Sequence, residues 1–517
     1  MKKNNSHKKH IVRNDHPTDK SEKSDQSVSS GLKAAGAWRR VPATPAIVCT
    51  VAFILFCWLM LPVRNGYMLH WYDEMSLFEP TRFFFRQALY FPGGLIRYCG
   101  AWLTQLMFYP YLGSAALVIL WLLLAWLTTK AFRLSREAAP LSLVVPLAML
   151  VSIVQIDDAW LSMKSIGYIY SNTISYLFTV AAVCLFRPTK NRSMLSFAVL
   201  LITVGCYFIA GFYALFAAFI GVILMVADSV RSKRFINLVF PAAVMATILI
   251  LPNLYYTHFR ATTVDNDYLL LKGLPDFLME SFDLYLWIPF IVATASLLVL
   301  AVLSALRSVP SSRWMTWVSV TVLCICAIWC FHADKKNEQL RATVVMLHHL
   351  ENNDWGGMAL VMSRIKEPPN YTMRVLNNFA MVNMGGKPED LKNIKPLNKD
   401  PRHAEGFSVT AYVNIPINYY NGDFNLSYRW GMEHNVQYGK RVFFLKYMVK
   451  SALLNGEIRL AKKYNDILLG TLFYRDWAKE MNRYIEDPSL IDSNIEFKSI
   501  LEFANINQNN DKQDATE

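Results

Sequence analysis

The residues whose types best suit chemistry are Asp73 and Glu74, an acidic pair that follows the first long apolar run of the chain. A carboxylate within hydrogen-bond reach of a hydroxyl group can accept its proton, and a second carboxylate can orient the first or hold a divalent cation. Three arginines follow, Arg82, Arg86 and Arg97, and a guanidinium pairs with phosphate oxygens through two parallel hydrogen bonds. The stretch could therefore combine a catalytic acid or base with groups that hold a lipid phosphate. An acidic helix cap at the lipid boundary is the alternative interpretation.

A second polar group lies in the stretch 253–283, where His258 and Arg260 could contact a phosphate. Asp265 and Asp267 could complete a site for a divalent cation, since hard divalent ions prefer carboxylate oxygens. The same Asp-Asn-Asp sequence is also common in turns. If this stretch closes over the acidic pair, the two groups would share one site.

The composition indicates where such a site must lie. Hydrophobic residues make up 54% of the 517 residues and charged residues 18%, and the mean hydropathy is +0.23, whereas soluble chains have roughly 45–50% and about 25%. A helix of about 20 apolar residues crosses ~30 Å of hydrocarbon. Nine runs are long enough: 45–63, 111–129, 139–156, 168–186, 193–210, 211–228, 235–252, 284–306 and 314–331. We expect an all-α protein with a nine-span membrane bundle over 43–331 and outer loops at 64–110 and 253–283.

The net charge of +13 indicates orientation rather than a nucleic-acid ligand, because the basic residues flank apolar runs instead of gathering on one folded face. Residues 1–42 are basic and polar, which predicts a disordered tail. The translocation machinery retains Lys and Arg in short cytoplasmic loops. With the tail in the cytoplasm, the basic residues of every even-numbered turn lie there too: Lys130, Arg133, Arg136, Arg187, Lys190, Arg192, Arg231, Lys233, Arg234, Arg307 and Arg313. We expect an inner (cytoplasmic) membrane protein whose carboxyl-terminal domain is extracytoplasmic, in the periplasm of a cell with two membranes.

The predicted spans hold no Asp, Glu, Lys or Arg in their interiors. Proton relays and ion-coupled carriers need an ionisable group at bilayer depth, so a pump is disfavoured and an active site belongs at the outer surface. The first outer loop must position the acidic pair. Its aromatic and aliphatic residues with a few arginines predict two short helices in the headgroup layer, separated by a turn at Pro92-Gly93-Gly94.

Residues 332–505 have longer charged stretches with apolar residues at helical spacing, which predicts a separate exported helical domain. The predicted helices are 338–352, 355–367, 371–384, 431–455, 457–471, 474–486 and 488–503. The stretch from Leu453 to Leu468 resembles a tetratricopeptide-like hairpin, and stacks of such hairpins leave a concave face for a protein partner. Within 394–430, the segment Ile415 to Asp423 is predicted as loop or short strand. Residues 506–517 are predicted to be a disordered tail.

The acidic pair just after the first span, the two juxtamembrane helices, the series of spans and the outer carboxyl-terminal domain together resemble the GT-C class of integral-membrane glycosyltransferases. The resemblance covers about residues 45–331. It implies that Asp73, with Glu74 beside it, is the catalytic acid or a ligand of a divalent cation. It also implies that the sugar donor is linked to a polyprenyl phosphate, which the arginines of the loop would hold.

The whole chain, including Tyr474-Arg475-Asp476-Trp477-Ala478, also resembles an uncharacterised family of bacterial multipass envelope proteins with an exported helical-repeat tail. That resemblance implies location and layout and no activity. Two functions therefore stay open. One is a GT-C-like glycosyltransferase that acts at the outer face, among membrane lipids, on a polyprenyl-phosphate-linked sugar. The other is a non-catalytic, membrane-anchored helical-repeat protein that recruits an envelope partner.

Overall fold

The computed structural model describes residues 45–504, apart from 156–166, 188–191, 234, 261–269, 276–277, 279–283, 307–312, 367, 386–406 and 503. From Pro45 onward the chain forms one compact unit. The described residues form helices joined by turns, and their single β feature is an isolated bridge between Lys272 and Leu274. The all-α prediction is therefore confirmed for this part of the chain. The predicted tails at 1–42 and 506–517 lie outside the described residues.

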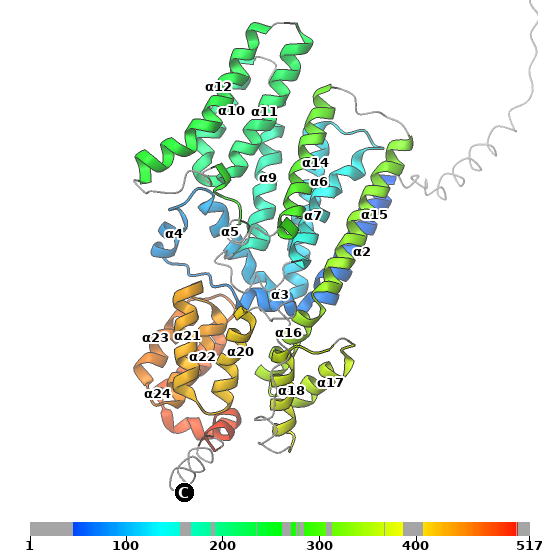
Figure 1. The fold of residues 1–517 in the computed structure, drawn as a ribbon. Helices are drawn as coiled ribbons and strands as arrows, with labels where there is room; N and C mark the ends of the chain where they lie inside the picture. Colours follow the sequence, from blue (N-terminus) through cyan, green and yellow to red (C-terminus); the bar gives the residue numbers. More distant parts are fainter. Residues whose placement is uncertain are drawn as a thin grey trace, which may run out of the picture. The chain divides into compact units, whose positions relative to one another are not determined.

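Within the described ranges, eight of the predicted spans form helices long and apolar enough to cross a membrane. Their main helices are α2 (Pro45–Trp58), α6 (Pro110–Phe132), α9 (Tyr168–Phe186), α10 (Arg192–Ala210), α11 (Phe212–Arg231), α12 (Val239–Leu254), α14 (Leu284–Leu306) and α15 (Arg313–Lys336), as Figure 1 shows. Large apolar side chains such as Leu55, Ile119 and Trp317 are 64–74% exposed on them. So much exposed apolar surface needs lipid around it. The helices therefore support the prediction of a helical membrane protein.

The remaining predicted span, 139–156, which is third in chain order, forms a shorter helical segment. It consists of the five-residue 3-10 turn η3 (Ala139–Leu143) and the 11-residue helix α7 (Val144–Val154). Every residue of α7 is buried, because α14, α15 and η3 pack around it. An apolar run looks the same in the sequence whether its neighbours are lipid tails or other helices. The structure places this one among helices.

Three described basic residues, Arg133, Arg187 and Arg231, come from turns that were predicted to share one side, and they line one cavity at one end of the helices. Arg187, after α9, donates from Nε to the carbonyl of Ala131 at 2.8 Å, and it also bonds Ser304 near the end of α14. Arg231, the last residue of α11, donates to the carbonyl of Ala305. The ends of α6, α9, α11 and α14 therefore meet. We call this region the basic end.

The first outer loop contains two short helices, as predicted: α4 (Arg82–Ala88) and α5 (Gly94–Thr104). Thr81 caps α4 by accepting a hydrogen bond from the Phe84 amide at 3.2 Å. Gly93 has a φ of +81°, a left-handed conformation that only glycine adopts without strain. The turn between the helices therefore depends on this glycine, and α4, which has no buried residue, packs through Phe84 and Phe85 on Tyr98 of α5.

The carboxyl-terminal part, which we call the tail domain (residues 338–504), is a series of helices joined by turns. They are α16 (Glu338–Glu351), α17 (Trp355–Arg364), α18 (Tyr371–Asn383), α20 (Phe407–Tyr420), α21 (Phe424–Tyr438), α22 (Val442–Leu454), α23 (Ile458–Leu469), α24 (Arg475–Glu486) and the 3-10 turn η8 (Pro488–Ser493). Most of these helices pack on their neighbours in sequence. Figure 1 shows two adjacent groups, α16–α18 and α20–α24, which are joined where Tyr420 donates to the carbonyl of Leu350 at 3.0 Å.

The prediction of loop or short strand from Ile415 to Asp423 is wrong. Residues up to Tyr420 belong to α20, and Pro416 lies inside that helix. Ile415 and Tyr419 are fully buried, with Tyr419 against Tyr447 of α22. Tertiary packing of this kind offsets the hydrogen bond that proline removes, and the local sequence does not reveal it.

The predicted single helix 431–455 is two helices, α21 and α22. Gly439, with a φ of +86°, ends the first, and extended Arg441 precedes the second. Most residues of α22 are buried, including those on either side of Lys446. The break therefore makes α22 a separate, largely buried helix of the tail domain, with Lys446 in its second turn.

Candidate functional site

The acidic pair lies at the end of a helix that changes direction as it leaves the first span. α2 continues through a π-helical turn, η1 (Leu59–Arg64), into α3 (Asn65–Glu74). Pro62 lies within η1 and has no amide hydrogen for an α-helical bond, which accounts for the wider turn. Figure 1 shows α3 running across the end of the neighbouring helices. Asp73 and Glu74, in its last turn, are buried.

Asp73 is 2% exposed and contacts the tail domain. The Tyr474 hydroxyl, just before α24, donates to Asp73 Oδ2 at 2.6 Å. Burial, together with the neighbouring carboxylates of Asp73 and Glu74, raises the pKa of Tyr474 well above its ordinary value, so the phenol keeps its proton and acts as the donor. The Phe108 ring covers it edge-on, with ring centroids 5.2 Å apart. This carboxylate therefore lies inside a domain interface.

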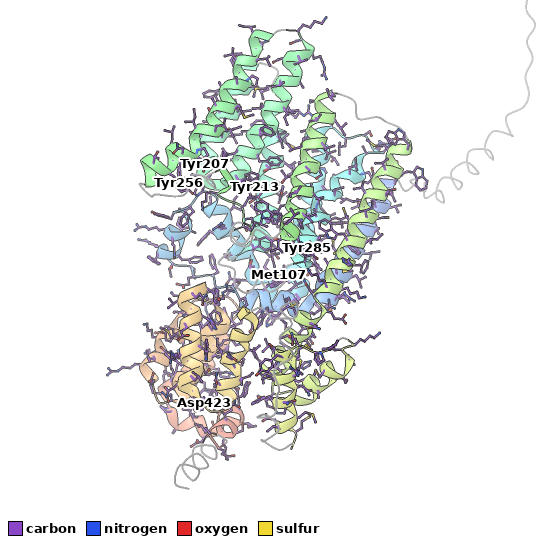
Figure 2. The ribbon with its side chains drawn as sticks, in the orientation of Figure 1. Met107, Tyr207, Tyr213, Tyr256, Tyr285 and Asp423 are labelled. Atoms are coloured by element: carbon purple, nitrogen blue, oxygen red, sulfur yellow. The ribbon has the colours of Figure 1, made fainter. Side chains whose placement is uncertain are left out.

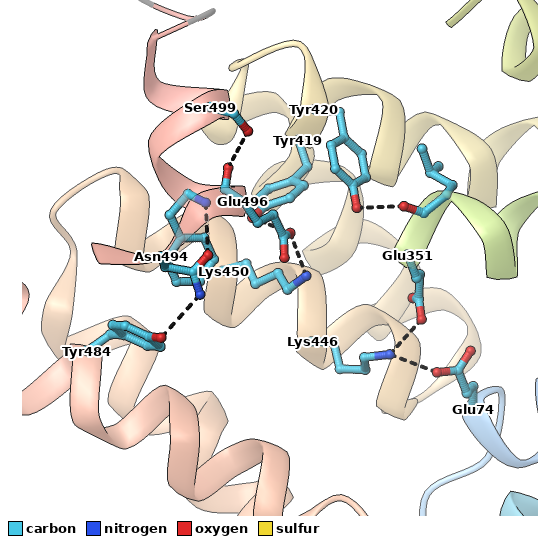
Figure 3. Close-up of polar contacts among 12 residues, drawn as sticks. Glu74, Glu351, Tyr419, Tyr420, Lys446, Lys450, Tyr484, Asn494, Glu496 and Ser499 are labelled. Atoms are coloured by element: carbon cyan, nitrogen blue, oxygen red, sulfur yellow. Dashed lines mark hydrogen bonds and ion pairs between the residues drawn. The ribbon is translucent and has the colours of Figure 1, made fainter. Parts of the chain in front are cut away.

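Glu74 belongs to a buried ion network, shown in Figure 3. Lys446 Nζ donates to Glu74 Oε1 and to Glu351 Oε2, each at 2.8 Å. Burial by itself lowers the pKa of Lys446, but the carboxylates of Glu351 and Glu74 outweigh it and raise that pKa above its ordinary value. Burial raises the pKa of the Glu351 carboxyl. The charged ammonium therefore joins α3, α16 and α22 at one point.

A second lysine extends this polar line through the tail domain. Lys450 Nζ donates to Glu496 Oε1 at 2.8 Å, and the Tyr419 hydroxyl donates to the same oxygen at 3.0 Å. Lys446 and Lys450 are four residues apart and so share one face of α22. The sequence of α22, VFFLKYMVKSALL, has two lysines in an otherwise apolar run. This pattern could have predicted that one face of the helix contacts buried acidic residues.

Asp334, near the end of α15, fastens the same junction, and the sequence analysis missed it. Its side chain is 1% exposed and accepts hydrogen bonds from Arg341 Nη1 at 2.7 Å and from Asn65 Nδ2 at 3.0 Å, and it pairs with Arg64. Arg64 and Asp334 are 270 positions apart, so no spacing rule could join them. These contacts join the end of η1 and the start of α3 to the end of α15 and the start of α16.

A cavity of about 10 Å³ lies beside the network and is lined in part by His70, His348, Glu74 and Glu351. Such a volume holds about one water molecule. Burial, and then the neighbouring His70, lower the pKa of His348. In the part of the chain that the structure describes, no group of three His, Cys, Asp or Glu residues is arranged to hold a metal ion. Among these residues the acidic pair therefore has no metal-binding group beside it, and the cavity next to Glu74 has room for about one water molecule.

The three arginines of the first outer loop do not gather around the acidic pair. Arg82 and Arg86 are exposed on α4. Arg97, on α5, is half-buried and donates from Nη2 to the carbonyl of Leu274 at 3.2 Å. The structure thus directs Arg97 to the fourth outer loop, whereas the partners of Asp73 and Glu74 described above come from the tail domain.

The first and fourth outer loops meet at Arg97 and Gly93, not at the acidic pair over which the fourth loop could close. A Cβ atom on Gly93 would lie 3.2 Å from the Gly273 Cα, and the Phe212 amide at the start of α11 donates to the carbonyl of Lys272 at 2.8 Å. Glycine at both positions, each with positive φ, is what permits this approach. Asp265 and Asp267 lie outside the described residues.

A small polar cavity of about 10 Å³ lies where these loops meet, lined in part by Arg97, Asn172 and Tyr213. The hydroxyl of Tyr213, which Figure 2 labels, donates to Asn172 Oδ1 at 2.9 Å. His258 and Arg260 belong to the π-helical turn η5 (Tyr255–Arg260), and their side chains are outside the described part. Of the residues predicted for phosphate binding, the structure therefore shows Arg97 alone beside this cavity.

Comparison with known families matches residues 40–516 to a model described as a family of unknown function, DUF6057. No curated protein and no solved structure matches the chain. The family match covers the membrane helices and the tail domain together, so their combination in one chain is a property of the family. The predicted resemblance to an uncharacterised family agrees with this result.

Proposed function

Because the chain belongs to the family of unknown function DUF6057, we propose its role from the geometry. It is a non-catalytic protein of the cell envelope, anchored in the membrane, whose tail domain recruits a protein partner. The observation that carries the proposal is the enclosure of Asp73 and Glu74 by Tyr474 and Lys446. A catalytic carboxylate must reach a substrate hydroxyl, whereas this pair fastens one domain to another.

Further contacts support a fixed orientation of the tail domain. Lys440 pairs with Glu79 of the first outer loop at 2.9 Å, and the rings of Phe108 and Phe473 stack with centroids 5.2 Å apart. A tether that only kept the domain near the membrane would need none of these contacts. Holding a domain in one orientation lowers the entropy lost when a partner binds, and this is the advantage we assign to the interface.

The proposal includes the topology predicted from charge: nine crossings of an inner bacterial membrane, the amino end in the cytoplasm and the tetratricopeptide-like tail domain outside. The segment formed by η3 and α7 extends roughly 26 Å at ~2.0 and ~1.5 Å per residue, close to the ~30 Å of hydrocarbon. Its amino-terminal side follows the basic turn at Arg133 and Arg136. Its carboxyl-terminal side meets Asn337, which donates to the carbonyl of Val154 at 2.8 Å. A reporter enzyme fused after Glu517 should be active outside the cytoplasm, and activity inside would refute this topology.

A GT-C-like glycosyltransferase is the second candidate, and one observation favours it. The first and fourth outer loops meet at Gly93 and Gly273, beside the polar cavity of Arg97, Asn172 and Tyr213. A site there would take the phosphate of a polyprenyl-linked sugar through Arg97, with Asp73 as the catalytic acid and a divalent cation on Asp265 and Asp267. The enclosed Asp73 is the reason we place this function second.

The two functions predict opposite results for a conservative change. A deletion strain carrying wild type, Asp73→Asn or Lys446→Met is compared for its envelope glycans, its lipid-linked sugars and its protein crosslinks. Crosslinks are taken from a photoreactive residue at Val436, which is 81% exposed on α21. The partner-recruiting function predicts normal glycans in every strain, crosslinks kept in Asp73→Asn and crosslinks reduced in Lys446→Met. Loss of one glycan or lipid-linked sugar in Asp73→Asn, with normal protein levels, would establish the enzyme instead.

A further inference from the structure

A cavity lies at the basic end, far in sequence from the acidic pair. It has a volume of about 590 Å³, within the range of ~300–1,000 Å³ that ligand sites occupy. Its lining includes Arg133, Arg187 and Arg231. It also includes apolar side chains from three helices: Leu195, Leu224, Met225 and Phe240. A cavity lined by both arginines and apolar side chains fits an amphipathic anion.

Two of the arginines are held by consecutive residues near the end of α14. Arg187 bonds the Ser304 hydroxyl and Arg231 bonds the carbonyl of Ala305, the next residue. Arg187 is also fixed by the carbonyl of Ala131. A guanidinium has five N–H donors, so these bonds leave donors on both arginines for a ligand. The contacts orient two cations towards one cavity without using up their binding capacity.

The charge balance at this site favours an anion. The guanidinium ions of Arg133 and Arg187 repel each other, and partial burial of Arg187 reduces screening by water. The carbonyls at the end of α14 offset part of that repulsion, as a helix C-terminus does for cations. Among the described residues that line the cavity, Asp228 is the single acid, and it is exposed. A phosphate between the arginines would complete the balance.

The surroundings indicate that the anion comes from the membrane. Asn237 and Phe240 line the cavity, while their neighbours Ile236 and Val239 are 79% and 64% exposed. Apolar side chains that stand so exposed on an apolar helix face lipid tails. One side of the segment 236–240 therefore contacts lipid, and the other side lines the cavity. A lipid can thus enter the cavity laterally from the bilayer.

We propose that this cavity binds an anionic phospholipid of the adjacent leaflet, with its phosphate on Arg187 and Arg231 and the start of an acyl chain against Leu224 and Met225. Basic pockets between membrane helices commonly take such headgroups. The site is separate from the acidic pair, and its existence does not depend on the function proposed for the tail domain.

The test measures lipid binding to the full-length protein, purified in detergent, by native mass spectrometry and thermal unfolding. The probes are phosphatidylglycerol, phosphatidylcholine with the same acyl chains, and inorganic phosphate. We expect phosphatidylglycerol to bind and to raise Tm, phosphatidylcholine to bind at least about tenfold more weakly, and inorganic phosphate to leave Tm unchanged. Equal binding of the two lipids would overturn the proposal, and protection by inorganic phosphate equal to that by phosphatidylglycerol would assign the site to a free anion.

The variant Arg187→Gln with Arg231→Gln should weaken phosphatidylglycerol binding about tenfold or more, because charge-assisted hydrogen bonds are lost. Arg136→Gln is the matched control, since Arg136 is exposed at the same end and does not line the cavity. Leu224→Trp keeps all three arginines and fills the apolar part, so it should also weaken binding. If the arginine variant does not fold, Leu224→Trp decides alone, and wild-type binding by either folded variant would overturn the proposal.

Discussion

Replacing Lys446 by methionine removes the ammonium that bridges Glu74 and Glu351 and leaves two carboxylates facing each other. Their side chains are 6% and 18% exposed, so bulk water has little access to the unpaired carboxylates. Removing one partner of a buried ion pair costs about 3–5 kcal/mol. Because these residues join α3, α16 and α22, we expect the tail domain to loosen from the membrane domain before either unfolds.

Two measurements follow this loosening in the purified protein. Thermal unfolding should show a Tm lower by several degrees in Lys446→Met than in wild type. Hydrogen exchange should be faster by roughly a hundredfold at the amides of α3 and α22, since each 1.4 kcal/mol of local opening energy is about a factor of ten. Exchange in α9 and α11, which do not contact Lys446, should be unchanged.

The matched control is Lys440→Met. Lys440 also links the tail domain to the first outer loop, but its pair with Glu79 is 49% and 19% exposed, and such a surface pair contributes less than about 1 kcal/mol. The triple variant Lys446→Met, Glu74→Gln, Glu351→Gln removes the buried charges together and should recover most of the lost stability. Equal effects of Lys440→Met and Lys446→Met would refute the claim that the buried network holds the domain.

Three further predictions concern neighbouring features. Tyr474→Phe leaves the buried Asp73 without its donor and should lower the free energy of unfolding by about 1–3 kcal/mol, whereas Asp73→Asn keeps an acceptor and should cost less in the same chemical-denaturation assay. Because the pKa of Lys446 is raised in the fold, its stabilisation is fully present below about pH 10.4 and is lost as the pH rises through the folded value. The Tm difference between wild type and Lys446→Met should therefore shrink above about pH 10.4, and a difference that grew there would contradict the assignment. Gly93→Ala combines a φ of +81° with a contact of 3.2 Å to Gly273 and should cost about 1–3 kcal/mol, while Gly205→Ala, where the added methyl meets nothing within 4 Å, should leave Tm the same or slightly higher.

Patterns of neighbouring residues in the sequence predicted the membrane helices and one of the turns. The apolar runs marked the membrane helices, since lipid selects for uninterrupted hydrophobicity, and Pro92-Gly93-Gly94 marked the turn between α4 and α5. The same reasoning failed at α20, where Ile415 to Asp423 was predicted as loop or short strand, because the burial of Ile415 and Tyr419 outweighs the hydrogen bond that Pro416 removes. For the candidate site, the sequence identified Asp73 and Glu74 as candidate functional residues. It did not predict their partners Tyr474 and Lys446.

Hydropathy and charge act residue by residue along the chain, so they were enough to predict a helical membrane protein with a helical carboxyl-terminal part. Contacts between distant segments set the rest: Asp73 meets Tyr474, Glu74 shares Lys446 with Glu351, and Arg187 and Arg231 line one cavity. Such partners are more than 40 and up to 401 positions apart. A carboxylate has the same identity whether it faces water, a substrate or a buried lysine. The role of a carboxylate depends on whether packing excludes water from it and on which charged groups packing places beside it.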